Sequence, residues 1–392
     1  VKVTVTGAEV MKIAGVRGWG GNAGGVLGDD GAASDTVREI SGLLWASDGL
    51  RAVSIGGEHG VGVDDTGTVY TWGAGAGGQL GLGTVLSTVT PERVALTEPV
   101  QAVAAGLAYT MAVTRSGKLY AWGANDAGQL GLGSGAGVAR FEPAPVVFTG
   151  SATSVTGTTT SMGRLVSVVA SGKTTLVLNE RGEVYGWGLN ANALLGGGVA
   201  PGVSSPTPVR IGGELLARRV VTLCLGGGTA YALTEDGAVY AWGSNMVGQV
   251  GDVEDSVVAE PTSVLGGGAG VADKVLAIAA GGSHALALMA DGRVVAWGEG
   301  SDGQLGDGAA TSSVAPTEVD ISGLSGIPVG MIAAGGTRSA LVTMDGRVFT
   351  WGGGVLSPEW MELDGGANRV SVSEQTVCLL YTSPSPRDQR GS

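Results

Sequence analysis

Cysteine, histidine and long apolar runs are scarce in this chain, and each shortage excludes a class of protein. Two cysteines, Cys224 and Cys378, cannot form a disulfide framework, and no cysteine and histidine group has zinc-ligand spacing. This favours a reducing compartment, cytoplasmic or nuclear. With only two histidines, hydrolytic triads lack their usual residues. No run reaches the about 18 apolar residues of a membrane-spanning helix, so no membrane association is expected.

Positive charge is also scarce. The 392 residues include 22 lysines and arginines against 35 aspartates and glutamates, a formal net charge of -13. Such a chain repels duplex nucleic acid, so direct nucleic-acid binding is not expected. Glycine is abundant, with 74 residues, but it shows no triplet period. Collagen and disorder are thereby excluded, and a folded, turn-rich protein is predicted.

A Trp-Gly pair recurs about every 50 to 65 residues along the whole chain. A glycine stands five residues before most of these tryptophans, between alternating apolar runs, which predicts hairpins and three short strands per repeat. A proline nineteen residues after four of them predicts an outer fourth strand. The repeated tryptophans are Trp19, Trp72, Trp122, Trp187, Trp242, Trp297 and Trp351.

A second signature follows most Trp-Gly pairs, as in GQLGLG from Gly78 and from Gly128 and GQLGD from Gly303. Each repeat of about 50 to 55 residues therefore predicts a four-stranded antiparallel sheet. One such sheet cannot bury both of its faces, so the copies are expected to stack around an axis as a β-propeller.

These motifs, above all WGANDAGQLGLG at Trp122 and WGSNMVGQVGD at Trp242, resemble the repeats of the RCC1 (regulator of chromosome condensation) family. The resemblance implies an all-β, seven-bladed β-propeller over residues 1–377. Strands from both chain ends are expected to complete one blade, because this removes exposed edges. The alternative is a window cut from a longer array.

Both ends of the chain depart from the pattern. The first residue is Val1 rather than Met, so we expect the N-terminus to be incomplete. The string CLLYTSPSPRD, Cys378 to Asp388, resembles a translated sequencing adapter, and residues 378–392 are expected to be foreign to the native chain.

No residue pattern predicts catalysis, a cofactor or a metal site. The string SGKTT from Ser171 lacks the leading glycine of a phosphate loop and falls on a turn of the repeat. His59 and His284 occupy one slot, thirteen residues before a repeat tryptophan. Because other repeats place Tyr, Thr or Arg there, we interpret both histidines, like the repeated tryptophans, as structural residues.

Departures from the repeat are the remaining candidates for partner binding, because propellers carry function on loops. The longest interval contains an insertion from Thr149 to Arg164, either a tolerated loop or a partner-binding tongue. Thr36 to Leu44 is predicted to form a short helical turn beside Trp45. The candidate partner-binding residues are Trp45, Thr149, Ser151, Thr153, Thr158, Arg164 and Trp360.

Two functions remain open. The first is a monomeric, non-enzymatic scaffold that binds a protein partner through the loops of a propeller face. The second, implied by the family resemblance, is guanine-nucleotide exchange on a Ran-like small GTPase, for which an acidic face would suit a basic surface. No exchange residue is carried over to this chain.

Overall fold

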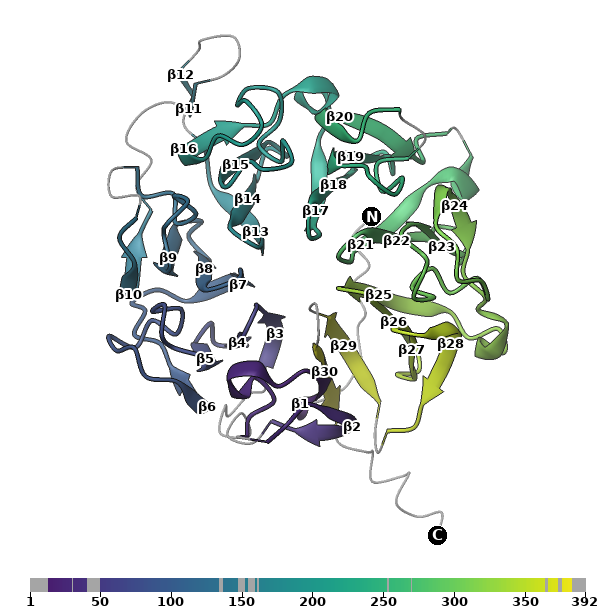
Figure 1. The fold of residues 1–392 in the computed structure, drawn as a ribbon, viewed down its shortest axis with the longest axis horizontal. Helices are drawn as coiled ribbons and strands as arrows, with labels where there is room; N and C mark the ends of the chain where they lie inside the picture. Colours follow the sequence, from purple (N-terminus) through teal and green to yellow (C-terminus); the bar gives the residue numbers. More distant parts are fainter. Residues whose placement is uncertain are drawn as a thin grey trace, which may run out of the picture.

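The computed structural model of the chain is a ring of antiparallel sheets around a central channel (Figure 1). It describes residues 13–29, 31–40, 50–133, 137–146, 152–153, 159–160, 162–251, 254–268, 270–363, 366–372 and 376–382. Consecutive strands are neighbours in each repeat-built sheet, with the first strand innermost and the fourth outermost (Figure 1). This is the arrangement of a β-propeller.

Six blades are each built from four consecutive strands and are numbered 1 to 6 in chain order. Blades 1 to 3 consist of β3 (Leu50–Ile55), β4 (His59–Asp64), β5 (Val69–Gly73) and β6 (Thr88–Arg93); β7 (Val100–Ala105), β8 (Tyr109–Thr114), β9 (Leu119–Gly123) and β10 (Arg140–Pro145); and β13 (Leu165–Ser171), β14 (Thr174–Asn179), β15 (Val184–Gly188) and β16 (Ser205–Arg210). Blades 4 to 6 consist of β17 (Val220–Leu225), β18 (Thr229–Thr234), β19 (Val239–Ser244) and β20 (Val257–Leu265); β21 (Val275–Ala280), β22 (His284–Met289), β23 (Val294–Gly298) and β24 (Ser313–Glu318); and β25 (Val329–Gly335), β26 (Arg338–Thr343), β27 (Val348–Gly352) and β28 (Val355–Met361).

A closing sheet joins the two ends of the chain between blades 6 and 1. It contains β1 (Ile13–Gly20), β2 (Ser34–Glu39), β29 (Ala367–Val372) and β30 (Thr376–Thr382), in the order β2-β1-β30-β29. The pairing of β1 with β30 agrees with the expectation that strands from both ends share a sheet. β30 includes the first residues of the segment expected to be foreign, whose origin stays a prediction.

The prediction of a seven-bladed propeller built from repeats is corrected to six such blades. A Trp-Gly motif marks only the third strand of a sheet. In the sheet of the first motif, at Trp19 in β1, the places of the first and second strands are taken by β29 and β30 from the other end of the chain. Counting motifs therefore overestimates the repeat-built blades by one.

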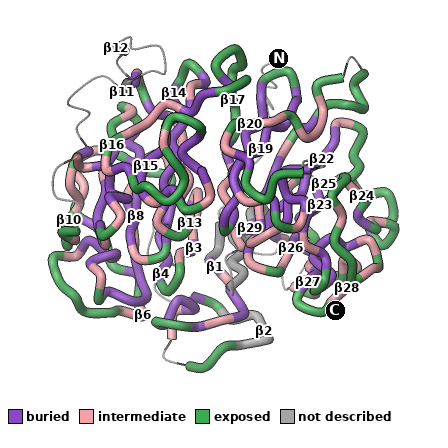
Figure 2. The backbone as a smooth tube through the Cα atoms, turned by 45° about the horizontal axis from the view of Figure 1, so that its top comes forward, coloured by how far each residue is buried: buried purple, intermediate pink, exposed green. Residues whose placement is uncertain are grey.

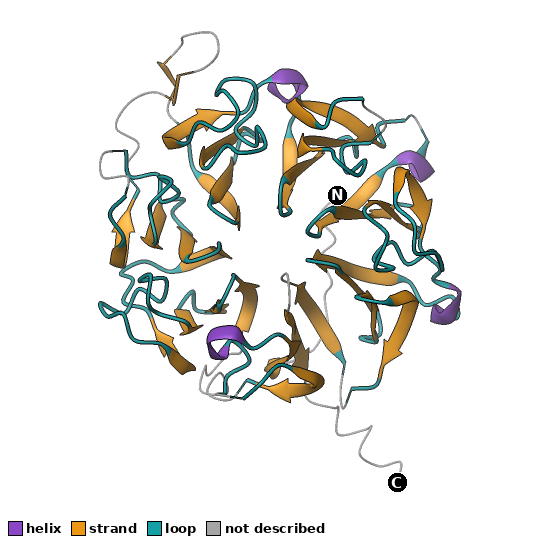
Figure 3. Ribbon diagram, in the orientation of Figure 1, coloured by secondary structure: helices purple, strands orange, loops and turns teal. Residues whose placement is uncertain are grey.

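Residues around the closing sheet correct a second prediction. The sequence predicts a helical turn beginning at Thr36, but Ser34–Glu39 pair with β1 as strand β2. The short 3-10 helices lie elsewhere, mostly at the rim of the ring (Figure 3). They are η1 (Ala23–Gly25), η3 (Gly213–Ala217), η4 (Val271–Asp273) and η5 (Ser322–Leu324).

The hydrophobic core is divided among the interfaces between neighbouring sheets. The second strand of blades 1 to 5 is buried at every position, because strands flank it within the sheet and other sheets cover both faces. Trp187 of blade 3, for example, packs with Val113 and Leu119 of blade 2. Tight hairpins keep the strands in register, and Gly67 takes the positive φ of 94° that such a turn requires.

The propeller has two ends of different construction, which remain exposed while the strands between them are buried (Figure 2). We call one end the loop face. It carries the turns between first and second strands and the loops between third and fourth strands. We call the other the hairpin face. It carries the hairpins between second and third strands and the connections to the next blade.

Candidate functional site

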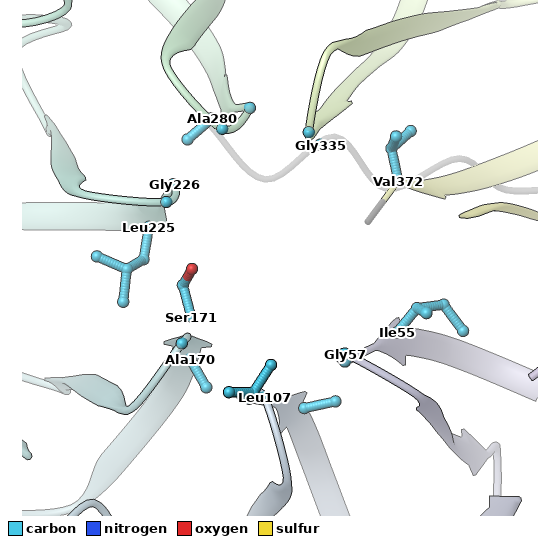
Figure 4. Close-up of a pocket in the computed structure, with 18 of the residues that line it drawn as sticks. Ile55, Gly57, Leu107, Ala170, Ser171, Leu225, Gly226, Ala280, Gly335 and Val372 are labelled. Atoms are coloured by element: carbon cyan, nitrogen blue, oxygen red, sulfur yellow. The ribbon is translucent and has the colours of Figure 1, made fainter. Parts of the chain in front are cut away.

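The central channel ends at the loop face in a small opening of about 120 Å³ (Figure 4). The turns of all six blades line it, mostly with glycine and alanine, and Val372 of the closing sheet completes the rim. Main-chain hydrogen bonds join neighbouring turns, as where the Gly282 amide donates to the Gly336 carbonyl oxygen, 2.8 Å away. None of the described lining residues is ionisable, so this opening offers no side chain that could act as a general acid or base.

The repeated tryptophans hold adjacent sheets together. Each indole in the six blades donates from Nε1 to a main-chain carbonyl of the preceding sheet, seven residues after that sheet's own tryptophan. The pairs are Trp72 with Val26 (2.8 Å), Trp122 with Gln79 (2.9 Å), Trp187 with Gln129 (2.9 Å), Trp242 with Leu194 (2.8 Å), Trp297 with Gln249 (3.0 Å) and Trp351 with Gln304 (2.9 Å).

This contact explains the signature that follows Trp-Gly. The Gln79 side chain accepts a bond from the amide of Gly77, 2.8 Å away, which folds the loop so that the Gln79 carbonyl faces Trp122. A Cβ on Gly81, whose φ is 69°, would lie 2.7 Å from the Trp122 Nε1 atom. The glutamine and the glycine after it therefore belong to the interface between blades, not to a ligand site.

His59 and His284 lie in the same interfaces and are fully buried. His59 Nε2 lies 2.9 Å from Thr110 Oγ1 of the next blade, and His284 Nε2 lies 2.8 Å from Ser339 Oγ. Desolvation lowers the pKa of each imidazole to about 4. Neutral, enclosed imidazoles fit the structural role proposed for both histidines and are out of reach of a substrate.

The loop face carries mostly negative charge. Its described turns and loops contain eight carboxylates and a single cation, Lys173, which forms an ion pair with Asp126. Two further cations, Arg140 and Arg338, stand at the adjoining ends of β10 and β26. The carboxylates are those of Asp29, Glu58, Asp126, Glu254, Asp255, Glu299, Asp302 and Asp307. The potential at this end of the propeller is therefore strongly negative.

The hairpin face carries charges of both signs, and most of its cations are paired with carboxylates. Its ion pairs include Lys118 with Glu98, Arg210 with Glu183, Arg218 with Asp236, Arg293 with Asp291 and Arg347 with Asp345. Pairing cancels much of the field at this end. The net negative charge of the chain is thus concentrated on the loop face.

The structure disperses the residues predicted for partner binding. Trp45, Thr149, Ser151 and Thr158 lie outside the described residues. Thr153 ends β11 (Ala152–Thr153), which pairs with β12 (Thr159–Thr160) within the insertion. Arg164 is exposed at the hairpin face, just before β13. Trp360, 59% exposed, lies on the outer strand β28, so no single surface gathers the described candidates.

Sequence reasoning missed the loop-face carboxylates as a group. A short acidic stretch such as Glu254 and Asp255 resembles a solvated turn when it is considered alone. A usable signal is the position of each charge within the repeat: the described loops between Trp-Gly and the fourth strand contain carboxylates and no lysine or arginine, whereas the hairpins after the second strand contain charges of both signs. Sorting charges by repeat position therefore predicts one face with few cations.

Metal ligands do not cluster in the described ranges. No group of three or more histidine, cysteine, aspartate or glutamate side chains there could hold a metal ion. Within the same ranges, none of the helices has the length and apolar character needed to cross a bilayer.

Known proteins resemble this chain in sequence and in fold. The model of the regulator of chromosome condensation (RCC1) repeat matches residues 66–113, 116–178, 236–288 and 291–342. The RCC1 domain-containing protein RUG3 of Arabidopsis thaliana is 33% identical over 343 residues, which cover 85% of this chain and 60% of that protein. The RCC1-like G exchanging factor-like protein of Mus musculus is 33% identical over 197 residues, 48% of this chain and 41% of that protein.

The fold of this chain is also similar to that of a solved structure. Prp20p from Saccharomyces cerevisiae superposes with a TM-score of 0.81 at 22% identity, covering 97% of this chain and 94% of that one. The chain spans less than two thirds of the length of the curated relatives it matches, 60% of RUG3 and 41% of the mouse protein. The repeat match covers more than half of the chain, and its repeated tryptophans and glutamines form the interfaces between blades. The chain therefore belongs to the RCC1-repeat family.

Proposed function

We propose that this propeller is a protein-interaction scaffold that binds a basic partner surface on its loop face. The observation that carries the proposal is the separation of charge, with the described carboxylates of the loop face nearly unopposed by cations. Such a field attracts a positively charged protein, accelerates its association and orients it. The rigid blades hold the loops in place, and binding needs no catalytic residue.

Blade 5 offers the densest part of this surface. Glu299, Asp302 and Asp307 all lie in the single loop between β23 and β24, and Asp302 is exposed to solvent. Glu254 and Asp255 lie in the corresponding loop of blade 4, next to it in the ring. An arginine or lysine cluster on a partner would thus meet five carboxylates on two adjacent blades.

Neutralising the blade 5 loop is expected to weaken binding about tenfold. The variant combines Glu299→Gln, Asp302→Asn and Asp307→Asn, because each exposed charge contact contributes roughly 0.2 to 1 kcal/mol. Binding of core histones and of a purified Ran-type GTPase is measured by interferometry between 50 and 300 mM salt. The matched control, Asp291→Asn with Asp345→Asn and Asp236→Asn, removes three carboxylates from the hairpin face and should leave affinity nearly unchanged.

The same assay distinguishes the loop face from the insertion. Deleting Ser151 to Ser161 removes β11 and β12 from the connection between blades 2 and 3 and should leave the melting temperature nearly unchanged. If this deletion weakens capture while the blade 5 variant does not, the binding surface is the insertion. If neither basic protein binds, or if the affinity is independent of salt, the proposed acidic docking surface is wrong.

Guanine-nucleotide exchange is the second candidate, favoured by two comparisons. The mouse relative is called an RCC1-like G exchanging factor-like protein, and the Prp20p structure is described together with its binding to Gsp1p and histones. An exchange factor must bind the nucleotide-free GTPase most tightly, because only differential affinity drives nucleotide release. A scaffold binds all nucleotide states alike. Release of a fluorescent GDP from the GTPase, with and without this chain, separates the two functions.

A further inference from the structure

One residue at the channel opening departs from the repeat. Two residues before the second strand, the turn of blade 2 places Leu107, whose side chain is 49% exposed beside the opening (Figure 4). The turn does not need this leucine for its conformation, because the other five blades have glycine at the same position. Those residues are Gly57, Gly172, Gly227, Gly282 and Gly336.

The surface of the opening is apolar. Beside the glycines and alanines of the turns it includes Ile55, Leu225 and Val372, and none of its described side chains carries a charge. Several main-chain amides of the turns already donate to a neighbouring turn, as Leu107 N does to Gly172 O, 2.8 Å away. Such a surface accepts an apolar group more readily than a charged one. Its volume of about 120 Å³ approaches that of a cavity of about 150 Å³ that holds benzene, so one aliphatic or aromatic side chain fits.

Further exposed aliphatic side chains lie on the same side of the loop face as Leu107. Val85 and Leu86, in the loop between β5 and β6 of blade 1, are 54% and 71% exposed. Val138, in the loop between β9 and β10 of blade 2, is 52% exposed. In the described turns and loops of these two blades, Glu58 is the one carboxylate outside an ion pair, because Asp126 is paired with a lysine. This side of the loop face is therefore chiefly apolar.

Other exposed apolar residues near this face have a structural explanation. Phe141, Val314 and Leu356 stand at the second position of their fourth strands, and each contacts a glycine of the preceding blade. A Cβ on Gly248, for example, would lie 2.4 Å from Val314 Cγ1. These three side chains therefore belong to the interfaces between blades.

The acidic blades lie across the channel from the apolar ones. Blades 4 and 5, which carry the five carboxylates of the proposed docking surface, stand opposite blades 1 and 2 in the ring (Figure 1). Among the described residues in the loops between third and fourth strands of blades 4 to 6, Met246 is the single exposed large aliphatic side chain. The loop face thus consists of an apolar side, the channel opening and an acidic side.

We infer that the partner lays a bipartite segment across the channel, apolar at one end and basic at the other, with one apolar side chain seated in the opening against Leu107. This inference rests on the proposed function and specifies its partner. The apolar end contacts Val85, Leu86 and Val138, and the basic end contacts the carboxylates of blades 4 and 5. An apolar side chain enclosed at the centre of an interface contributes more to binding than contacts at its rim. The opening therefore anchors the segment, while the two sides of the face set its direction.

Two synthetic peptides of about 20 residues test the inference by fluorescence anisotropy, since a helix of that length spans about 30 Å. In the bipartite peptide, leucine and serine fill one half and lysine and serine the other. The mixed peptide contains the same residues in mixed order. We expect the wild-type chain to bind the bipartite peptide about tenfold more tightly than the mixed one. Leu107→Gly, which introduces the residue of the other five blades, should remove most of this preference without changing the melting temperature.

Leu86→Ser should weaken the bipartite peptide about threefold, because it removes a contact at the rim. The matched control is Val271→Ser on the hairpin face, since Val271 is 73% exposed against 71% for Leu86. It should leave the affinity for both peptides unchanged. The inference is wrong if the wild-type chain binds both peptides alike, or if Leu107→Gly and Leu86→Ser keep the full preference for the bipartite peptide.

The salt dependence tests the proposed function separately. Neutralising the blade 5 loop should weaken both peptides and reduce the loss of affinity between about 50 and 300 mM salt. If this variant binds like the wild type, the acidic docking surface is wrong, whichever peptide binds more tightly. If equal binding of the two peptides is lost together on neutralisation, the acidic surface stands and the apolar anchor is wrong. If neither peptide binds, both proposals are wrong.

Discussion

Replacing Trp242 by alanine is expected to lower the free energy of unfolding by about 3 to 5 kcal/mol. The indole is fully buried between blades 3 and 4 and packs with Leu176, Leu223 and their neighbours. Its Nε1 atom also donates to the Leu194 carbonyl, 2.8 Å away. Alanine would leave a cavity and an unpaired carbonyl in the same interface, and both destabilise the fold.

Urea unfolding of Trp242→Ala, Trp242→Phe and Trp360→Ala separates these contributions. Phenylalanine keeps most of the volume and loses the hydrogen bond, so it should cost roughly 1 to 2 kcal/mol. Trp360 is 59% exposed on an outer strand, and its removal should cost about 0.5 kcal/mol or less. If Trp242→Ala costs less than about 1 kcal/mol, the assignment of the repeated tryptophans to the interfaces is wrong.

The fold could be predicted from sequence because one interface is repeated many times. Trp-Gly and the Gln-Leu-Gly signature are both needed by the same contact, the indole of one sheet against the loop of the preceding sheet, and the turn glycine forms the hairpin that leads into the strand carrying the indole. The number of repeat-built blades could not be obtained in this way. Closure depends on which strands pair at the two chain ends, and β29 and β30 carry no Trp-Gly motif.

The candidate binding surface could not be predicted by looking for unusual residues. Exposed tryptophan and an inserted loop are local signals, and the structure gathers neither into one surface. The acidic loop face depends instead on ordinary residues such as Glu58, Asp126 and Asp302, which are far apart in sequence. They share one end of the propeller only because every blade has the same strand direction.

Two buried histidines should make the free energy of unfolding fall as the pH falls, beginning at pH values above the range in which carboxylates titrate. Ser339 Oγ donates to the Gln304 carbonyl, 2.9 Å away, so its one proton is used. His284 Nε2 must therefore donate to Ser339. The Nδ1 atom is then the unprotonated one, and it has no hydrogen-bond partner among the described residues. Thr110 and the Gln79 carbonyl impose the same tautomer on His59.

The sign of the pH dependence follows from the pKa values. Desolvation lowers the pKa of each histidine from 6.5 to about 4, against small opposing effects of the Tyr109 main chain on His59 and of Glu299 on His284. Between pH 6.5 and 4 the unfolded chain binds more protons than the folded chain, so stability falls as the pH falls. Each histidine should lower the free energy of unfolding by about 3 kcal/mol between pH 6.5 and 4.

Carboxylates titrate in a different window. Asp236 and Asp345 have pKa values lowered from 3.8, chiefly because Thr234 and Thr343 donate hydrogen bonds to them. Their contribution to stability is present above pH 3.8 and is lost only as the pH falls through the lower folded value. A loss of stability between pH 6.5 and 4.5 is therefore assigned to the histidines.

Unfolding by urea at pH 7.5, 6.0 and 5.0 tests this assignment with substitutions that the chain's own repeats already contain. Thr174 and Thr229 occupy in blades 3 and 4 the slot that His59 and His284 occupy in blades 1 and 5. His59→Thr and His284→Thr should each remove about half of the pH dependence, and the double variant should be nearly independent of pH in this range. A double variant that keeps the wild-type slope would show that other groups bind the protons. A wild-type chain with no slope would mean that the imidazoles are hydrated and keep their ordinary pKa values, which their complete burial between two blades opposes.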